Sequence, residues 1–243
     1  MNAQPFQAFL LDLLRQAQIS QNTFFQELPP GEMEIIGEPD SWSAKDHVAH
    51  LTFWRRRLTL MVQAHLRKAP QPNIDHFEQL NPLVFEENRS RAWPDILAES
   101  DHAYADLLEV TEQLSDEDLT ASDRFDWMPD GMPLYLSFMG NWYEHTQIHL
   151  GSYFLDRHDL ARATNVYEVW ASNIVEAEVP SPLKGNILYN LACFYALNDQ
   201  VEKAASSLES ALELAPELKE WSLKDSDLDA LRTKQAGQTS EAD

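Results

Sequence analysis

Apolar residues recur at steps of three and four positions along the first 28 residues of the chain. Such spacing places them on one face of a helix, which here carries Phe6, Leu10, Leu13, Leu14, Ala17 and Phe24. The sequence "LPPGE" comes next, and its prolines and glycine cannot continue a regular helix. The pattern therefore predicts a helix over about residues 4–28.

A second helix is predicted over about residues 43–68, in a stretch that begins "SWSAKDHVAHLTFW" and is followed by "APQPN". Ser43 is a favourable N-cap, and Asp46 three residues later completes a capping box, with Asp in place of the usual Glu. Trp42 precedes the cap and His47 lies in the first turn, two positions that often pack on each other as a hydrophobic staple. We therefore expect His47 to be a structural residue that rests on Trp42.

Two further long helices are predicted, one over residues 93–114 and one from about residue 133 onward. The last of these carries on one side Leu134, Phe138, Trp142, His145, His149 and Tyr153. A loop rich in Asp, Pro and Gly should separate the two, and part of the link after the second helix should be helical from Pro82 on. Four long helices in about 155 residues favour a four-helix bundle, in which the long second link permits a crossover to a parallel neighbour.

The chain changes character after about residue 157. One helix is predicted in "DLARATNVYEVWASNIVEAEV", and "GNILYNLACFYALNDQVEKAASSLESALELAPEL" then reads as a helix, a short turn and a helix. Small residues at Ala192, Ala204 and Ala211 alternate with large ones, which lets two helices approach closely. The spacing resembles a tetratricopeptide repeat of about 34 residues. Only one full repeat is visible, with "SDLDALR" as a predicted capping helix.

These patterns predict an all-α chain in three parts. We expect a bundle over residues 1–157, a tetratricopeptide-like extension over 158–234 and a disordered polar tail over 235–243. Cys193 lies within the extension, between Ala192 and Phe194, and is interpreted as a small packing residue.

Charge and composition narrow the classes of partner. The formal net charge of −22 disfavours binding to duplex nucleic acid or to an anionic membrane surface. The three arginines at Arg55, Arg56 and Arg57 are interpreted as a solvated helix face. A single cysteine allows no disulfide within the chain, and Asp12 interrupts the first apolar stretch, unlike a signal peptide. We therefore expect a cytoplasmic protein that binds neither nucleic acid nor membrane.

Two histidines four positions apart, His145 and His149, are the first candidates for chemistry. At this spacing both rings leave one helix face and can reach one ion, although a wet helix face or a satisfied core pair is the alternative. Thr146 stands where zinc proteases of the HExxH type carry their glutamate, so that class is not supported. His50 would supply a third ligand if the second and fourth helices are neighbours. Three neutral imidazoles suit Zn, Ni, Cu or Fe better than Mg or Ca.

The remaining candidates have weaker support. Asp46 and Glu144 are the nearest acids in the sequence, but neither is identified as a general base. His102, on the third long helix, is a candidate additional ligand or supporting group. His65, His76 and His158 have no partner in the pattern.

The stretches "DSWSAKDHVAHLTFW", "LSDEDL" and "EHTQIHLGSY" together resemble the DinB-like superfamily, especially its DfsB-like branch. The resemblance covers about residues 5–156. It implies a four-helix bundle of up-down-down-up topology and a divalent metal ion held by His50, His145 and His149.

The resemblance also implies two classes of activity. One is a thiol-dependent transferase, in which the metal activates the thiol of a low-molecular-weight cofactor, and the other is a hydrolase. We expect zinc or nickel, with iron and manganese as alternatives, and a small-molecule substrate. The competing hypothesis is a non-catalytic scaffold that binds a protein partner through the helical extension. We expect the extension to pack on the bundle, extending its core or a homodimer interface.

Overall fold

The structure, a computed structural model, describes residues 5–72 and 77–233. All regular structure in these residues is helical, and one isolated bridge joins Glu38 and Ser41 in a loop. The predicted all-α class is therefore confirmed. The chain divides into two compact units, Met1–Arg157 and His158–Asp243. The predicted disordered tail lies outside the described residues.

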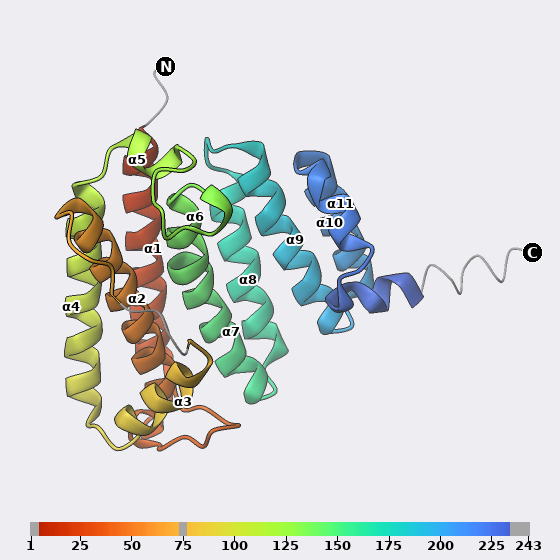
Figure 1. Ribbon diagram of the computed structural model, residues 1–243. Coiled ribbons are helices and arrows are strands. Elements are labelled where there is room, and N and C mark those ends of the chain that lie inside the picture. Colours follow the sequence, from red (N-terminus) through yellow and green to blue (C-terminus); the bar gives the residue numbers. More distant parts are fainter. Residues whose placement is uncertain (1–4, 73–76, 234–243) are drawn as a thin grey trace, which may run out of the picture. The chain divides into compact units, whose positions relative to one another are not determined.

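Four long helical segments build the first unit (Figure 1). They are α1 (Phe6–Glu27), α2 (Ala44–Leu66), α4 (Trp93–Glu112) and a composite last segment of α6 (Tyr135–Phe138), a π-helical stretch (Met139–Glu144) and α7 (His145–Asp156). These bounds agree with the predicted helices to within a few residues at each end.

The link between α2 and α4 contains α3 (Phe77–Asn88), which begins five residues before the expected start and has Pro82 inside it. The link carries the chain back along the bundle, so that α2 and α4 run parallel while α1 and α7 run the other way (Figure 1). Helix α2 packs against both α4 and α7. The up-down-down-up order therefore makes the second and last long helices neighbours.

The segment between α4 and α6 is more regular than predicted. A short helix, α5 (Asp116–Thr120), lies in the expected loop. Ser115 caps it, because its hydroxyl accepts from the Asp118 backbone while the Asp118 carboxylate accepts from the Ser115 backbone N–H. The acidic residues Asp116, Glu117 and Asp118, which were predicted to lie in a loop, thus form the first turn of a helix. Carboxylates are favourable there because they interact with the helix dipole.

The predicted start of α2 is confirmed. The Ser43 hydroxyl accepts from the backbone of Asp46, and the Asp46 carboxylate accepts from the Ser43 N–H at 2.9 Å. A Cβ at Gly37 would collide with this carboxylate, so the preceding loop can pass only with glycine there. The Trp42 and His47 ring centroids lie 5.4 Å apart, as the hydrophobic staple requires.

Arg55 lies in the centre of the bundle and is 1% exposed. Its guanidinium donates to Gln21 Oε1 at 2.8 Å and to Thr146 Oγ1 at 2.9 Å, and it lies 4.1 Å from the centroid of the Tyr104 ring. A further contact joins it to Ser100 Oγ at 3.5 Å. Its partners therefore come from α1, α4 and α7, and no carboxylate of the described residues pairs with it.

The prediction that all three consecutive arginines face solvent is consequently wrong for Arg55. Successive helical residues are rotated by about 100°, so three in a row cannot all share the outer face. Arg56 is exposed, as predicted, and Arg57 is half-buried.

The second unit contains α8 (Leu160–Val175), α9 (Ser181–Leu197) and α10 (Val201–Leu214). Helix α9 packs against both of the others. Ala192, Ala204 and Ala211 have no exposed surface, and a Cβ at Gly185 would collide with Ala215. The small residues therefore let α9 and α10 approach closely, as the alternation of small and large residues predicted.

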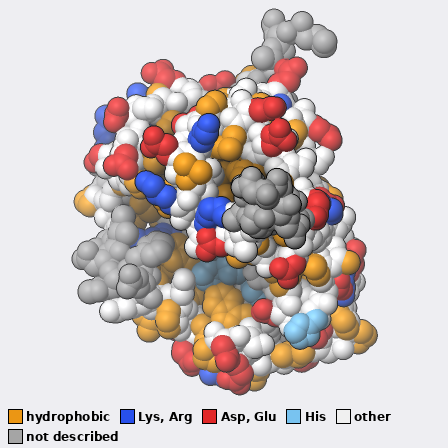
Figure 2. All heavy atoms as spheres, turned by 90° about the vertical axis from the view of Figure 1, so that its right-hand side faces the viewer, with side chains coloured by type: hydrophobic (Ala, Val, Ile, Leu, Met, Phe, Trp, Pro, Cys, Tyr) orange, Lys and Arg blue, Asp and Glu red, His pale blue; other side chains and the backbone are white. Residues whose placement is uncertain are grey.

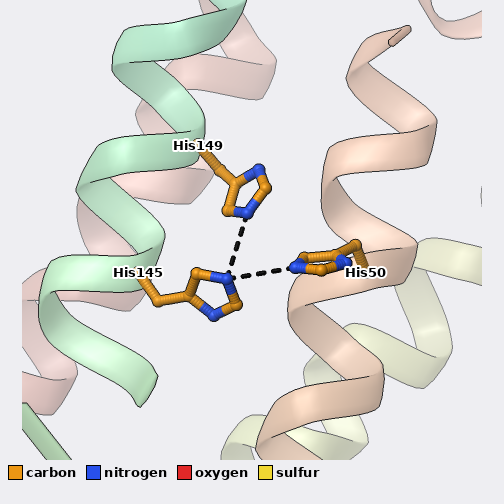
Figure 3. Close-up of side chains that lie close together, drawn as sticks. All are labelled: His50, His145 and His149. Carbon is orange, nitrogen blue, oxygen red and sulfur yellow. Dashed lines mark hydrogen bonds between the residues drawn. The ribbon is translucent and has the colours of Figure 1, made fainter. Parts of the chain in front are cut away.

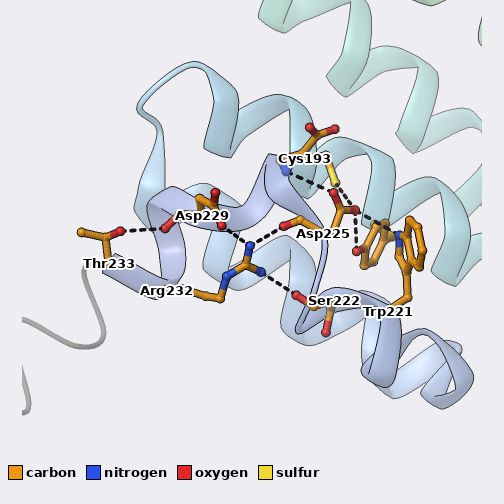
Figure 4. Close-up of polar contacts among 9 residues, drawn as sticks. Cys193, Trp221, Ser222, Asp225, Asp229, Arg232 and Thr233 are labelled. Carbon is orange, nitrogen blue, oxygen red and sulfur yellow. Dashed lines mark hydrogen bonds and ion pairs between the residues drawn. The ribbon is translucent and has the colours of Figure 1, made fainter.

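Asp225 ties the end of the second unit to α9 (Figure 4). Its carboxylate accepts from Tyr189 Oη at 2.8 Å and from Trp221 Nε1 at 3.1 Å, and Cys193 Sγ lies 3.8 Å away. Burial, and then the charge of Asp225, raise the pKa of the Cys193 thiol to about 12. Cys193 is therefore a protonated packing residue. None of the described helices is both long and apolar enough to cross a bilayer.

The buried contacts of Arg55 generate a stability prediction. Arg55→Met removes the guanidinium and leaves Gln21 and Thr146 without a donor, so the free energy of unfolding should fall by about 2–4 kcal/mol. Urea denaturation followed by circular dichroism measures this. Arg56→Met alters the same charge on an exposed side chain and should change the free energy by no more than about 0.5 kcal/mol. Equal effects of the two substitutions would contradict the central role of Arg55.

Candidate metal centre

Three histidines from two helices meet inside the bundle (Figure 3). His50 projects from α2, and His145 and His149 project from successive turns of α7. His145 Nε2 lies 3.0 Å from His50 Nε2 and 3.1 Å from His149 Nε2. One ligand atom from each ring lies within 4.8 Å of the others. The structure therefore brings together the three residues that the sequence analysis singled out.

Hydrogen bonds among the three rings cannot give every one of these nitrogens a partner. A neutral imidazole has one N–H and one lone pair, so His145 Nε2 can form a hydrogen bond with only one of its two neighbours. The other contact then leaves two nitrogens close together without a well-formed hydrogen bond. A cation that accepts three lone pairs removes this conflict. Metal–nitrogen bonds of about 2.0–2.1 Å place tetrahedral ligands about 3.3 Å apart, close to the separations observed.

All three imidazoles are held in the neutral state that a metal ligand needs. Burial, and then the charges of His145, His47 and Arg55, lower the pKa of His50 from 6.5 to about 3. Burial and the charge of Arg55 lower the pKa of His145 to about 4. The pKa of His149 is lowered well below its usual value by burial and by the other histidines. Their lone pairs are therefore free at neutral pH.

A fourth histidine, His47, belongs to the same cluster. The sequence analysis gave it only the staple role against Trp42, but its Nδ1 also lies 2.8 Å from His149 Nδ1. Burial and then Arg157 lower its pKa to about 3, so it is neutral. The signal that could have found it is its spacing of three residues from His50, which places both on one face of α2.

The contact between His47 and His149 determines which nitrogens carry protons. If His149 binds an ion through Nε2, its Nδ1 must carry the proton and donate to His47 Nδ1. Metal-binding histidines commonly donate their second nitrogen in this way, usually to a carboxylate or a carbonyl. Here a neutral imidazole takes that place, so the cluster gains no negative charge from its surroundings.

Aromatic rings form one wall of the cluster. Trp42 stacks on His149 with centroids 5.7 Å apart and lies 5.1 Å from the His50 ring. Tyr153, whose ring faces His47, donates to Glu32 Oε2 at 2.7 Å, and Arg157 donates to the same oxygen at 3.0 Å. The ion pair neutralises the nearest charges on this side, and the histidines meet mainly apolar surface.

The cluster is partly open to solvent. His50 is 5% exposed, whereas His145 and His149 are half-buried. Figure 2 shows histidine side chains at the floor of a hollow, beside hydrophobic side chains. His145 and His149 therefore keep part of their surface toward solvent.

The other residues considered from the sequence do not join the cluster. The Asp46 carboxylate is engaged in the capping box, and no carboxylate of the described residues completes the group of converging ligands. His102 is exposed on α4, His65 packs on Phe125 with centroids 4.2 Å apart, and His158 is exposed. His76 lies outside the described residues. Within residues 5–72 and 77–233, the converging ligands are therefore imidazoles alone.

The lowered pKa values predict how the stability of the metal-free protein depends on pH. The unfolded chain takes up protons near the ordinary pKa of 6.5, whereas the folded histidines take them up near 3 to 4. Between these values acid favours the unfolded state, so the free energy of unfolding should fall by up to about 1.4 kcal/mol per pH unit for each histidine.

Urea denaturation of chelator-treated protein from pH 7 to 4 measures this dependence. His50→Gln should give a shallower decline than the wild type, because one buried imidazole no longer resists protonation. His102→Gln, at an exposed position on α4, should reproduce the wild-type profile. Identical profiles for all three proteins would show that the cluster does not set the pH dependence.

Neither the curated proteins nor the solved structures contain a match to the chain. The family model of the DinB superfamily matches residues 13–152, which include α2, α4, the first eight residues of α7 and all four clustered histidines. The match covers more than half of the chain, and on this basis the protein belongs to the DinB superfamily.

Proposed function

We propose that His50, His145 and His149 bind one divalent transition-metal ion and that the protein is a metal-dependent enzyme acting on a small molecule. The observation that carries the proposal is the convergence of three neutral Nε2 atoms at contacts of 3.0 and 3.1 Å. Imidazole ligands favour zinc or nickel, with iron as an alternative, whereas manganese prefers oxygen ligands. When bound, such an ion supplies Lewis acidity that lowers the pKa of a thiol or a water molecule.

Each surrounding residue has a defined part in this proposal. His47 orients His149 through the contact between their Nδ1 atoms. Burial, and to a smaller extent the charge of Arg55, lowers the pKa values of the three ligands and keeps their lone pairs available. Trp42 covers His50 and His149 with an apolar face that excludes water from one side. The solvent-accessible part of His145 and His149 would be where the reactants approach the ion.

The absence of a carboxylate from the described cluster favours a thiol over water as the activated nucleophile. A hydrolase that removes a proton from water usually holds a general base within hydrogen-bond reach. The ligand group here contains only imidazoles, so activation of a nucleophile would rest on the charge of the ion. A thiol suits this arrangement better than water, because its ordinary pKa of about 8.5 is already close to neutrality.

The chain does not supply that thiol itself. Cys193 is its only cysteine, and the pKa of this buried thiol is raised to about 12. A thiolate would therefore come from a low-molecular-weight cofactor. We favour a thiol transferase over a hydrolase on these grounds.

A second candidate function is a protein-interaction scaffold, favoured by one observation in the second unit. Trp221 and Leu223 are 61% and 67% exposed on the segment that follows α10. Large apolar side chains gathered on a surface often mark an interface. If α9 and α10 act as a tetratricopeptide-like pair, this surface would take a protein partner or a second copy of the chain.

Metal analysis tests the first proposal. Protein produced without a histidine tag should retain close to one zinc or nickel ion per chain after loading and desalting, as measured by plasma mass spectrometry. The double variant His145→Ala, His149→Ala should retain none, because a single remaining imidazole cannot hold the ion.

A matched control replaces two histidines outside the cluster. His102→Ala with His158→Asn removes the same number of imidazoles, and asparagine tolerates the positive φ of 58° at position 158. This variant should bind as much metal as the wild type. Equal metal content in all three proteins, or none in the wild type, would contradict the proposed site.

The role of His47 can be separated from that of the ligands. His47→Phe keeps a ring against Trp42 but cannot accept from His149 Nδ1, so metal affinity should fall about 10- to 100-fold. His47→Asn places an amide oxygen near the lost nitrogen and should restore most of the affinity. Competition with a chromophoric chelator measures both constants. Equal affinities for His47→Phe and the wild type would contradict an effect of His47 on metal binding and would limit its role to packing on Trp42.

A further inference from the structure

A small cavity lies beside the histidine cluster in the first unit. Its volume is about 250 Å³, which corresponds to roughly eight water molecules at about 30 Å³ each. Trp54, Leu58 and Met61 of α2 form an apolar side, and Trp127, from the loop before α6, closes another. The size and lining suit part of a small organic molecule.

The helices place this cavity next to the proposed metal centre. On α2, Trp54 follows His50 by one turn, and on the antiparallel last segment Asn141 precedes His145 by one turn. Both helices therefore lead from the histidines to the cavity in the same direction, at about 5.4 Å per turn. The Trp54 ring, which lines the cavity, has its centroid 6.2 Å from that of His50.

Two residues of the lining each carry a hydrogen-bond donor that has no acceptor. Arg57 Nη2 and Trp127 Nε1 are both buried and form no hydrogen bond. A buried donor without a partner costs free energy, and in native structures it usually indicates a missing partner. Because both groups are donors and neither can accept, the missing partner has to present acceptor atoms.

The positive charge of Arg57 indicates that the missing partner is negatively charged. Of the described arginines, Arg55, Arg57 and Arg67 form no ion pair. Arg67 is exposed to water, and Arg55 already donates through Nη2 to Gln21 and Thr146 in the core, where its Nε has no acceptor. Arg57 is half-buried with its guanidinium 5.8 Å from the Trp54 ring, in a chain with 40 acidic residues. A single anion is therefore the partner that the cavity lacks.

A second cavity, of about 480 Å³, also borders Arg57, on the side of α3 and α4. Its other arginines, Arg56 and Arg91, both pair with Glu99. Their charges are already opposed within the protein, and no indole donor without an acceptor lines that cavity among the described residues. The smaller cavity is therefore the better anion site.

We propose that the cavity between α2 and the segment before α7 binds a carboxylate group of the substrate, held by Arg57 and Trp127. The apolar body of the molecule would contact Trp54, Leu58 and Met61, and its far end would point along the helices toward the histidines. The identification of the molecule as the substrate rests on the proposed metal-dependent function. Carboxylate binding itself does not, since Arg57 and Trp127 are present with or without an ion.

Binding of benzoate and of its neutral isostere benzamide tests the proposal on full-length, metal-free protein. Isothermal titration calorimetry gives the affinities, and NMR follows the indole N–H signals, of which that of Trp127 is assigned by Trp127→Phe. Benzoate should bind at least about tenfold more tightly than benzamide and should shift the Trp127 signal, because a hydrogen bond to a charged group is worth this much.

Variants of three arginines locate the anion. Arg57→Met should weaken benzoate about tenfold or more and leave benzamide unchanged, while Arg57→Lys should retain part of the preference. Arg67→Met removes the same charge from an exposed position on the C-cap of α2 and should have little effect. Arg91→Met tests the larger cavity and should also have little effect.

Several outcomes would overturn the proposal. These are equal affinities for benzoate and benzamide, no binding of benzoate at its highest soluble concentration, or an effect of Arg57→Met no larger than that of Arg67→Met. A loss with Arg91→Met as large as that with Arg57→Met, without a shift of the Trp127 signal, would place the anion in the larger cavity instead. Metal content is measured in the same preparations, so a failure of the metal proposal is recognised separately.

Discussion

The placement of one uncompensated cation, Arg55, at the centre of the bundle is the constraint on which the rest of the structure depends. Transfer of a charge from water to a protein interior is costly unless hydrogen bonds and polarisable groups replace the lost solvent. Gln21, Thr146 and the face of Tyr104 provide this replacement, and they come from three different helices. The four helices are therefore held in one arrangement, because any other packing would leave the guanidinium without partners.

The same cation links the fold to the chemistry. Burial of the clustered histidines is the largest cause of their lowered pKa values, and the positive charge of Arg55 adds to it at His50, His145 and His149. It opposes their protonation and leaves lone pairs at His50, His145 and His149 pointing at one another. A carboxylate beside Arg55 would cancel this effect. The lack of such a partner is thus consistent with a site that must remain neutral to receive a metal ion.

The surroundings of the cluster bear on the proposed reaction. Imidazole ligands, an aromatic wall at Trp42 and the lack of a described carboxylate base favour activation of a nucleophile by an ion alone. The Cys193 thiol contacts the Asp225 carboxylate and stays protonated because its pKa is raised. The chain therefore offers no thiolate of its own. Arg57 differs from Arg55 in that no neutral side chain of the described residues accepts from its buried Nη2.

The sequence by itself determined the helices, the capping box at Ser43 and the three histidines, because these follow from local periodicity and short motifs within single helices. The pairing of His50 with α7 needed the crossover topology, which the long link and the family resemblance predicted. Only the tertiary structure decided the roles of Arg55, His47 and Arg57. Each depends on which way one residue of a helix points and on what another helix places opposite it. Three consecutive arginines look alike in a sequence, but the rotation of about 100° per residue sends one to the core, one to solvent and one to a cavity.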